Sequence, residues 1–64
     1  MFVNGKEIKI EKTLSLKNFL EKEKYIIERV AVEKNGSLVP KKLFDTEMLT
    51  DDDTLEIVHF VGGG

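Results

Sequence analysis

The chain has 64 residues, a net charge of −2 and no cysteine, with 41% hydrophobic and 34% charged residues. This length fits one small domain, and the lack of cysteine excludes disulfides, zinc–thiolate sites and cysteine nucleophiles. The two signs of charge are interspersed without a basic patch, so we expect no nucleic-acid partner. Because the sequence has neither a membrane-length apolar run nor a secretory signal, we expect a cytoplasmic location and no membrane association.

The first ten residues predict a β-hairpin. Asn4-Gly5 supplies the positive backbone angles of a tight turn, and hydrophobic residues alternate with polar ones on either side. The core face is expected to carry Met1, Val3, Ile8 and Ile10. Phe2 falls on the opposite face and is expected to be exposed.

A helix is predicted after this hairpin, from Ser15 as its N-cap to about Lys24. Its apolar residues recur at helical spacing and predict a single face packed on a sheet. These residues are Leu16, Phe19 and Leu20.

A second hairpin is predicted across Asn35-Gly36. Val30 and Val32 alternate with more polar residues before this turn, and a short strand at residues 38–39 is closed by Pro40 because proline cannot donate to a ladder. Residues 41–44 predict a helical turn, and Leu49 is expected to be buried.

Three consecutive aspartates, Asp51, Asp52 and Asp53, precede the last predicted strand. A hard cation requires ligands at spaced loop positions, so we expect a solvated turn and no metal site. Asp52 is expected to take the strained backbone position of that turn, because aspartate tolerates it better than most residues.

Residues 54–61 predict the final strand, rich in β-branched and aromatic side chains. If Leu55 and Ile57 point into the core, Val58 and Phe60 point outward. Parallel pairing of the first and last strands is expected to bring Phe2 beside Val58 and Phe60. These three residues would form an exposed apolar patch for a partner, the alternative being that lysine stems cover them.

Three glycines follow: Gly62, Gly63 and Gly64. Glycine loses the most conformational freedom on ordering, so we expect a mobile tail that ends in a carboxylate. Without Cβ atoms such a tail can enter a narrow channel and be chemically activated inside a partner. The alternative is a frayed end or a linker remnant.

The order of hairpin, capped helix, strand, turn, short strand and final strand resembles the α+β, ubiquitin-like β-grasp fold. This fold implies a mixed sheet of four to five strands with one main helix across it, formed by residues 1–61, and a flexible tail at residues 62–64. Several segments, in this order, resemble the ThiS sulfur carrier family of thiamine biosynthesis: Val3-Asn4-Gly5, Val30-Ala31-Val32, Val39-Pro40-Lys41 and the run from Leu55 to Gly64.

The resemblance implies a carrier that is not itself an enzyme and holds no cofactor. A ThiF-like adenylyltransferase would use ATP and Mg to adenylate the Gly64 carboxylate, and sulfur from a donor such as a cysteine desulfurase would convert it to a thiocarboxylate. Thiazole synthase would then receive the sulfur. His59 lacks a nearby nucleophile in the sequence and is expected to be a packing or interface residue.

Three alternatives remain open at this point. The small subunit of molybdopterin synthase uses the same fold and tail, although it is usually longer. A covalent protein modifier in the manner of ubiquitin would instead form isopeptides. A non-catalytic β-grasp interaction module would keep its function without Gly63 and Gly64.

Overall fold

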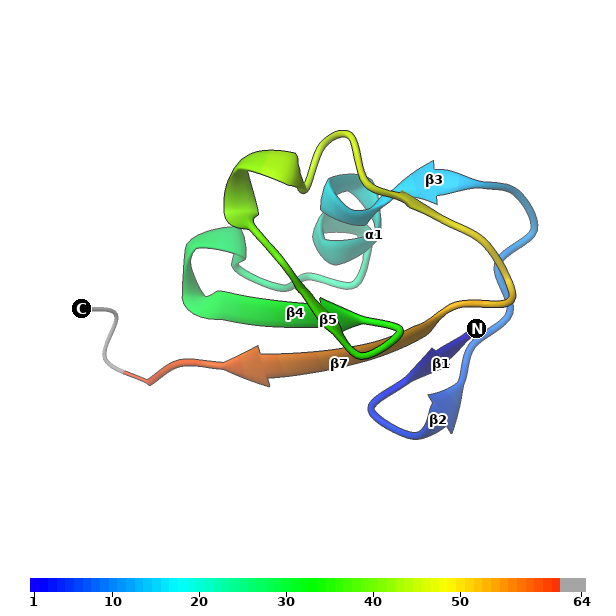
Figure 1. The fold of residues 1–64 in the computed structure, drawn as a ribbon, viewed down its shortest axis with the longest axis horizontal. Helices are drawn as coiled ribbons and strands as arrows, with labels where there is room; N and C mark the ends of the chain where they lie inside the picture. Colours follow the sequence, from blue (N-terminus) through cyan, green and yellow to red (C-terminus); the bar gives the residue numbers. More distant parts are fainter. Residues whose placement is uncertain (62–64) are drawn as a thin grey trace.

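The computed structural model describes residues 1–61 of the chain. Its main layer is a five-stranded sheet with the order β2-β1-β7-β4-β5, and α1 lies across one face of it (Figure 1). The strands of this sheet are β1 (Phe2–Val3), β2 (Lys6–Glu7), β4 (Val30–Lys34), β5 (Ser37–Val39) and β7 (Thr54–His59). The remaining elements are β3 (Leu14–Ser15), α1 (Leu16–Lys22), η1 (Ile27–Arg29), η2 (Lys41–Leu43) and β6 (Met48–Leu49).

β7 lies in the middle of the sheet. It pairs antiparallel with β4 from Val30 opposite His59 to Lys34 opposite Leu55, and parallel with β1 on its other side. The two hairpins, β1–β2 and β4–β5, are antiparallel. The predicted mixed sheet, the predicted parallel pairing of the first and last strands, and both Asn-Gly turns are confirmed.

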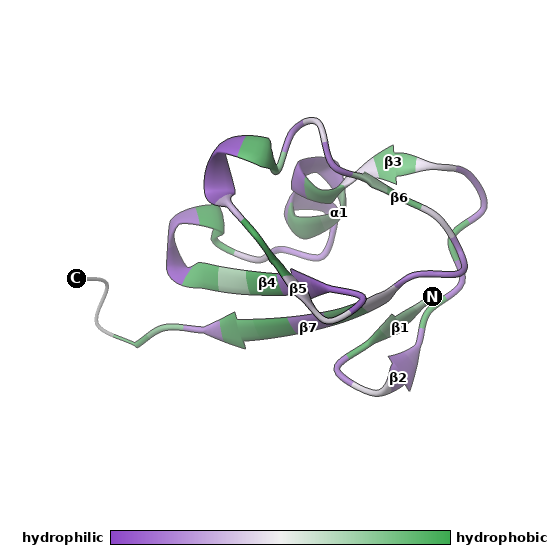
Figure 2. Ribbon diagram, viewed as in Figure 1, coloured by the Kyte–Doolittle hydropathy of each residue, from purple (hydrophilic) through white to green (hydrophobic). Residues whose placement is uncertain are grey.

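The core lies between the sheet and α1. Figure 2 shows hydrophobic residues concentrated on β4 and β7, whereas β2 is hydrophilic. The fully buried side chains include Phe19, Leu20, Val30, Val32 and Leu55, and Leu49 is also fully buried as predicted. Ile8 and Ile10 are only partly buried and pack against the edge of this core.

The local sequence of α1 explains both of its ends. The Ser15 hydroxyl accepts a hydrogen bond from the Asn18 N–H at 3.0 Å, which confirms the predicted N-cap. The helix ends at Lys22, slightly earlier than predicted, because Lys24 adopts a left-handed backbone with φ of 67°. The Tyr25 N–H then donates to the Leu20 carbonyl at 2.8 Å, as in a Schellman motif.

The segment at residues 44–49 covers the start of α1, an arrangement absent from the sequence-based prediction. β6 pairs antiparallel with β3 through Leu49 opposite Leu14. The first helical N–H groups need partners outside the helix. The Leu16 N–H donates to the Glu47 carbonyl at 2.7 Å, and the Lys17 N–H donates to the Phe44 carbonyl at 2.8 Å. Phe44 is almost fully buried and completes the core on this side.

Among residues 1–61 no helix has the length and apolar character needed to cross a membrane.

Candidate functional site

The outer face of the sheet, turned away from α1, carries an apolar patch. Along β7, Leu55 and Ile57 are buried, whereas Val58 is 59% exposed and Phe60, just after the strand, is 46% exposed. The predicted inward and outward directions in this segment are therefore confirmed. The strand itself ends at His59 rather than at residue 61.

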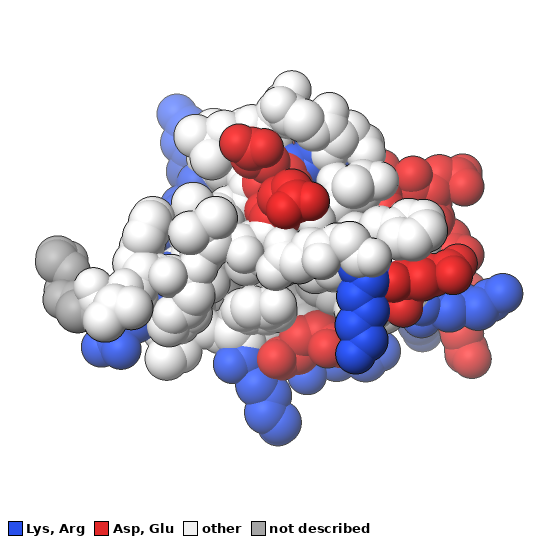
Figure 3. Space-filling view, turned by 90° about the horizontal axis from the view of Figure 1, so that it is seen from below, with Lys and Arg blue, Asp and Glu red and all other residues white. Residues whose placement is uncertain are grey.

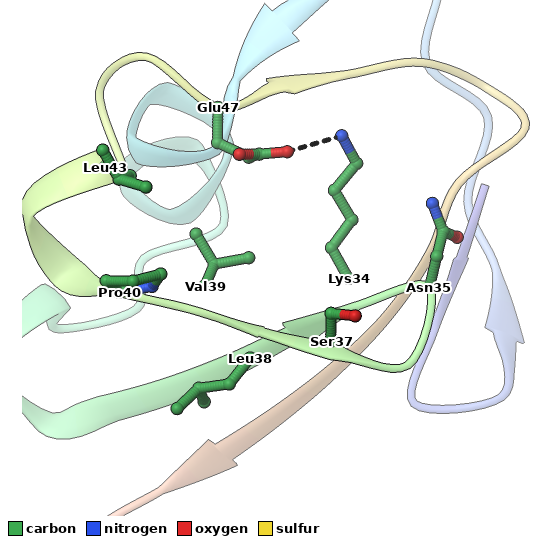
Figure 4. Close-up of a pocket in the computed structure, with 8 residues that line it drawn as sticks. All are labelled: Lys34, Asn35, Ser37, Leu38, Val39, Pro40, Leu43 and Glu47. Carbon is green, nitrogen blue, oxygen red and sulfur yellow. Dashed lines mark hydrogen bonds and ion pairs between the residues drawn. The ribbon is translucent and has the colours of Figure 1, made fainter.

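Two further residues extend this patch across the sheet. Ala31 on β4 lies opposite Val58. Leu38 on β5 is 65% exposed, and its side chain lies on the other side of β5 from Val39 (Figure 4). We call Ala31, Leu38, Val58 and Phe60 the outer-face patch. Leu38 was not part of the predicted patch, although the alternation of Leu38 with buried Val39 contains that signal.

Phe2 does not belong to the outer-face patch, so the prediction that it lies beside Val58 and Phe60 is wrong. Phe2 is exposed, at 45%, but its partner on β7 is Thr54. Phe60 lies six positions after Thr54, which corresponds to about 20 Å along a strand. β1 is only two residues long and pairs with the beginning of β7, so Phe2 lies at the opposite end of the strand.

Charged side chains are distributed unevenly over this face. Figure 3 shows uncharged surface at the end where the described chain leaves the sheet, with Lys and Arg side chains at its margin. Acidic side chains lie in the middle of the view and at the opposite end. A partner that docks near the end of β7 therefore meets an apolar surface with cationic neighbours.

The course of β7 is fixed on both sides by asparagine side chains from the two hairpin turns. Asn4 accepts from the Ile57 N–H at 2.7 Å and donates to the Ile57 carbonyl at 3.2 Å, so its amide extends the pairing of β1. Asn35 accepts from the Thr54 N–H at 2.9 Å and donates to the Asp53 carboxylate at 2.9 Å. Both asparagines have a φ of 52°. They therefore position the strand that leads to the tail.

The aspartates before β7 stabilise the turn through their side chains. The Asp51 carboxylate accepts hydrogen bonds from the Ile10 N–H and from the Met1 amino group, both at 3.1 Å, and these lower the pKa of Asp51. Burial opposes ionisation of Asp53. However, hydrogen bonds from the Thr50 N–H and the Asn35 amide outweigh that effect and lower its pKa.

Asp52 has a negative φ, so the prediction of backbone strain there is wrong. The Asp53 carboxylate accepts from the Thr50 N–H at 2.8 Å, and this bond closes the turn without a left-handed residue. In the described part of the chain, no group of three His, Cys, Asp or Glu side chains could hold a metal ion.

A shallow groove of about 350 Å³ runs along β5 on the core side of the sheet (Figure 4). Its apolar wall comes from Val39, Pro40 and Leu43. At its other side the Lys34 ammonium contacts the Glu47 carboxylate at 2.8 Å, and this hydrogen bond raises the pKa of Lys34. The ion pair joins β4 to the segment before β6, which is a structural role.

His59 is exposed on β7, opposite Val30. Of the two serines in the chain, Ser15 caps α1 and Ser37 begins β5. Neither serine lies at the end of β7, where the exposed His59 side chain is available for contact with a partner. The predicted tail residues, Gly62, Gly63 and Gly64, lie outside the described residues.

The sequence profile described as the ThiS family matches residues 1–64. The chain belongs to the ThiS family. ThiS family membership agrees with the β-grasp arrangement described above, since the crystal structure of a thiamine biosynthesis protein (ThiS) from Geobacter metallireducens superposes with a TM-score of 0.82. That structure is 32% identical in sequence, and the match covers 98% of this chain and 96% of that one.

Individual ThiS-like relatives fall into three groups. The sulfur carrier protein ThiS of Bacillus subtilis is 38% identical over 63 residues, which cover 97% of this chain and 96% of that protein. The uncharacterized protein ycf40 of Pyropia yezoensis is 42% identical over 62 residues, with 97% and 87% covered. A thiazole synthase of Magnetococcus marinus is 36% identical over 62 residues, which cover 97% of this chain and only 19% of that protein.

Proposed function

We propose that this chain is a sulfur carrier of thiamine biosynthesis, which holds sulfur as a thiocarboxylate on Gly64. The observation that carries the proposal is the match to the sulfur carrier protein ThiS of Bacillus subtilis over 97% of this chain and 96% of that one. The fold supports this proposal. β7 is the central strand of the sheet, it ends next to the outer-face patch, and the three glycines follow it in the sequence.

The proposed chemistry takes place on the terminal carboxylate. A carboxylate is a poor electrophile, so a ThiF-like adenylyltransferase first joins a Gly64 oxygen to the α-phosphorus of ATP, and pyrophosphate leaves. A sulfur nucleophile then attacks the acyl carbon, and the bond to AMP breaks. The carrier contributes the acyl group and the docking surface, whereas the partner contributes ATP, Mg and the catalytic groups.

We further propose that thiazole synthase receives the sulfur. The thiazole synthases of Magnetococcus marinus and Paramagnetospirillum magneticum each contain a segment like this chain, matched over 19% and 20% of their lengths. Fusion in one polypeptide raises the effective concentration of one domain at the other, so it is expected for proteins that work in succession. A cysteine desulfurase is the proposed sulfur donor, and the ATP-dependent reaction is placed in the cytoplasm.

The outer-face patch is the proposed docking surface for the activating partner. Leu38, Val58 and Phe60 are apolar and exposed, and Ala31 between them is partly exposed. A contiguous patch of this kind on a small domain marks a protein interface more often than scattered apolar residues do. Because the sheet already orders the backbone of these residues, little backbone entropy is lost when a partner binds. The adjoining residues 61–64 can then enter the active site of the partner.

The test of this function is the intact mass of the chain after incubation with ATP, sulfide and a ThiF-like enzyme that is active on another ThiS. Exchange of one oxygen for sulfur should add the mass difference between these atoms, located in the C-terminal peptide. A chain lacking Gly64 serves as the control and should stay unmodified. Absence of the mass gain in the full chain would contradict the proposal.

A further inference from the structure

Among the described residues, Phe60 is the last one that forms a hydrogen bond with the body of the domain. Its N–H donates to the Arg29 carbonyl at 2.6 Å, one step beyond the pairing of Val30 with His59. Val61, the next residue, is 97% exposed. The direction in which the chain leaves the sheet is therefore set at Phe60.

A lysine from a different segment stands over the Phe60 ring. The ammonium nitrogen of Lys41 lies 6.0 Å from the ring centroid, within the range of a cation–π interaction. The same nitrogen donates a hydrogen bond to the Glu28 carbonyl at 2.8 Å. This exposed bond therefore holds the ammonium group near the ring in the free chain.

The backbone around Lys41 is equally well fixed. Lys41 begins η2, directly after Pro40, whose φ is −61°. The Leu43 N–H donates to the Pro40 carbonyl at 2.9 Å and the Phe44 N–H donates to the Lys41 carbonyl at 3.1 Å, so the turn that carries Lys41 is closed on itself. Three segments thus meet at the end of β7: the turn η1, the turn η2 and Phe60.

We propose that Lys41 is a positioning residue, which acts through the Phe60 ring to fix the direction in which residues 61–64 leave the sheet. The proposal rests on the proposed function, because the direction matters for a tail whose carboxylate reacts inside a partner. In this proposal Lys41 acts on the Phe60 ring, and the partner acts on the carboxylate.

The length of the tail explains why its origin matters. Residues 61–64 can span at most about 14 Å. If Phe60 already points the tail toward its target, less conformational freedom is lost when the partner binds, so productive binding is tighter and KM is lower. A cation–π contact at an exposed site corresponds to about a two- to fivefold effect on an equilibrium.

The test is a double-mutant cycle in the adenylation reaction, with the full chain and a ThiF-like enzyme. Lys41→Met keeps an apolar stem of similar length but removes the cation, and Phe60→Leu removes the ring. Lys41→Met should raise the KM for the carrier by about two- to fivefold at unchanged kcat. Lys42→Met makes the same change of charge at the neighbouring residue and should leave KM unchanged. Lys41→Arg should keep the KM of the unaltered chain, because arginine retains the positive charge.

The double variant Lys41→Met/Phe60→Leu separates an indirect role of Lys41 from a direct one. If Lys41 acts through Phe60, its removal should add nothing once the ring is gone, so the double variant should have the KM of Phe60→Leu alone. If the two effects on KM multiply, Lys41 acts on the partner itself and the proposal is wrong. Equal KM values for Lys41→Met and Lys42→Met would also overturn it.

A measurement on the carrier alone completes the test. The ring current of Phe60 should shift the Lys41 ε-methylene protons upfield in NMR spectra, and Phe60→Leu should abolish that shift. An unshifted resonance in the unaltered chain would show that the contact does not exist. If the enzyme fails to adenylate the unaltered chain, the proposed function is wrong, and the NMR shift still decides whether Lys41 holds Phe60.

Discussion

The position of the proposed docking surface on the sheet can be tested with two phenylalanines that are almost equally exposed. Phe60 is 46% exposed in the outer-face patch and Phe2 is 45% exposed at the other end of β7. A phenylalanine side chain buries about 200 Å² when it is fully covered. Docking over Phe60 would therefore cover a further area of about 90 Å², worth about 2 kcal/mol at 25 cal/mol per Å².

Phe60→Ala should accordingly weaken binding of a ThiF-like partner by about 30-fold, since 1.4 kcal/mol corresponds to a tenfold change in Kd. Phe2→Ala removes the same side chain with the same exposure and should change Kd by less than about twofold, because Phe2 lies outside the patch. Isothermal titration calorimetry with the purified partner measures both constants, and thermal unfolding checks that both variants remain folded. Equal weakening by the two substitutions would refute the structural placement of the patch and favour docking along the whole length of β7.

Three further outcomes concern stability. Asn4→Gly retains access to positive φ but removes both amide hydrogen bonds to Ile57. The free energy of unfolding, measured in urea, should therefore fall by about 2 kcal/mol. An unchanged urea midpoint would show that these bonds contribute nothing to stability. Lys24→Gly should raise that free energy by about 0.5 kcal/mol by relieving the φ of 67°, and a decrease would contradict the assigned strain. The pKa of Asp53 is lowered from its ordinary value of 3.8, so its stabilisation is complete above about pH 4 and is lost as the pH falls through the folded pKa. The urea midpoint should therefore fall on acidification, and Asp53→Asn should reduce that dependence; an identical pH profile would exclude Asp53 as a cause.

Features that depend on local chemistry were predictable from the sequence. Ser15 caps α1 because a serine hydroxyl satisfies a free helical N–H wherever the helix begins. Asn-Gly pairs favour positive φ in any hairpin, and both turns form where they were predicted. The alternation of Leu55 and Ile57 with Val58 likewise defines two faces, because the side-chain period of a strand is fixed.

Features that depend on register were not predictable in the same way. The alternation around Phe2 indicates which face it occupies but carries no information on where β1 lies along β7. The pairing of β3 with β6 joins Leu14 to Leu49 through strands of two residues, too short for a recognisable period. Lys41 and Phe60 approach each other only because β7, η1 and η2 meet in space.

The Asn4 and Asn35 side chains combine a feature that was predictable from local sequence with one that was not. Their turns were predicted, whereas their hydrogen bonds to β7 were not, because these partners lie far along the chain. The same holds for Asp53, whose carboxylate was expected in a solvated turn but is buried under hydrogen bonds from Asn35 and Thr50.

The central place of β7 has a consequence for biosynthesis. β7 is the last described strand to leave the ribosome, yet it separates β1 from β4, so the sheet cannot close until Thr54–His59 has emerged. Until β7 is made, the edges of β1 and β4 that later pair with it have no partner strand, because these contacts span most of the chain. Any chain cut short before β7 lacks the strand between the two hairpins and stays unfolded. Proteases can then remove such fragments, so only chains that contain the complete β7 are expected to persist.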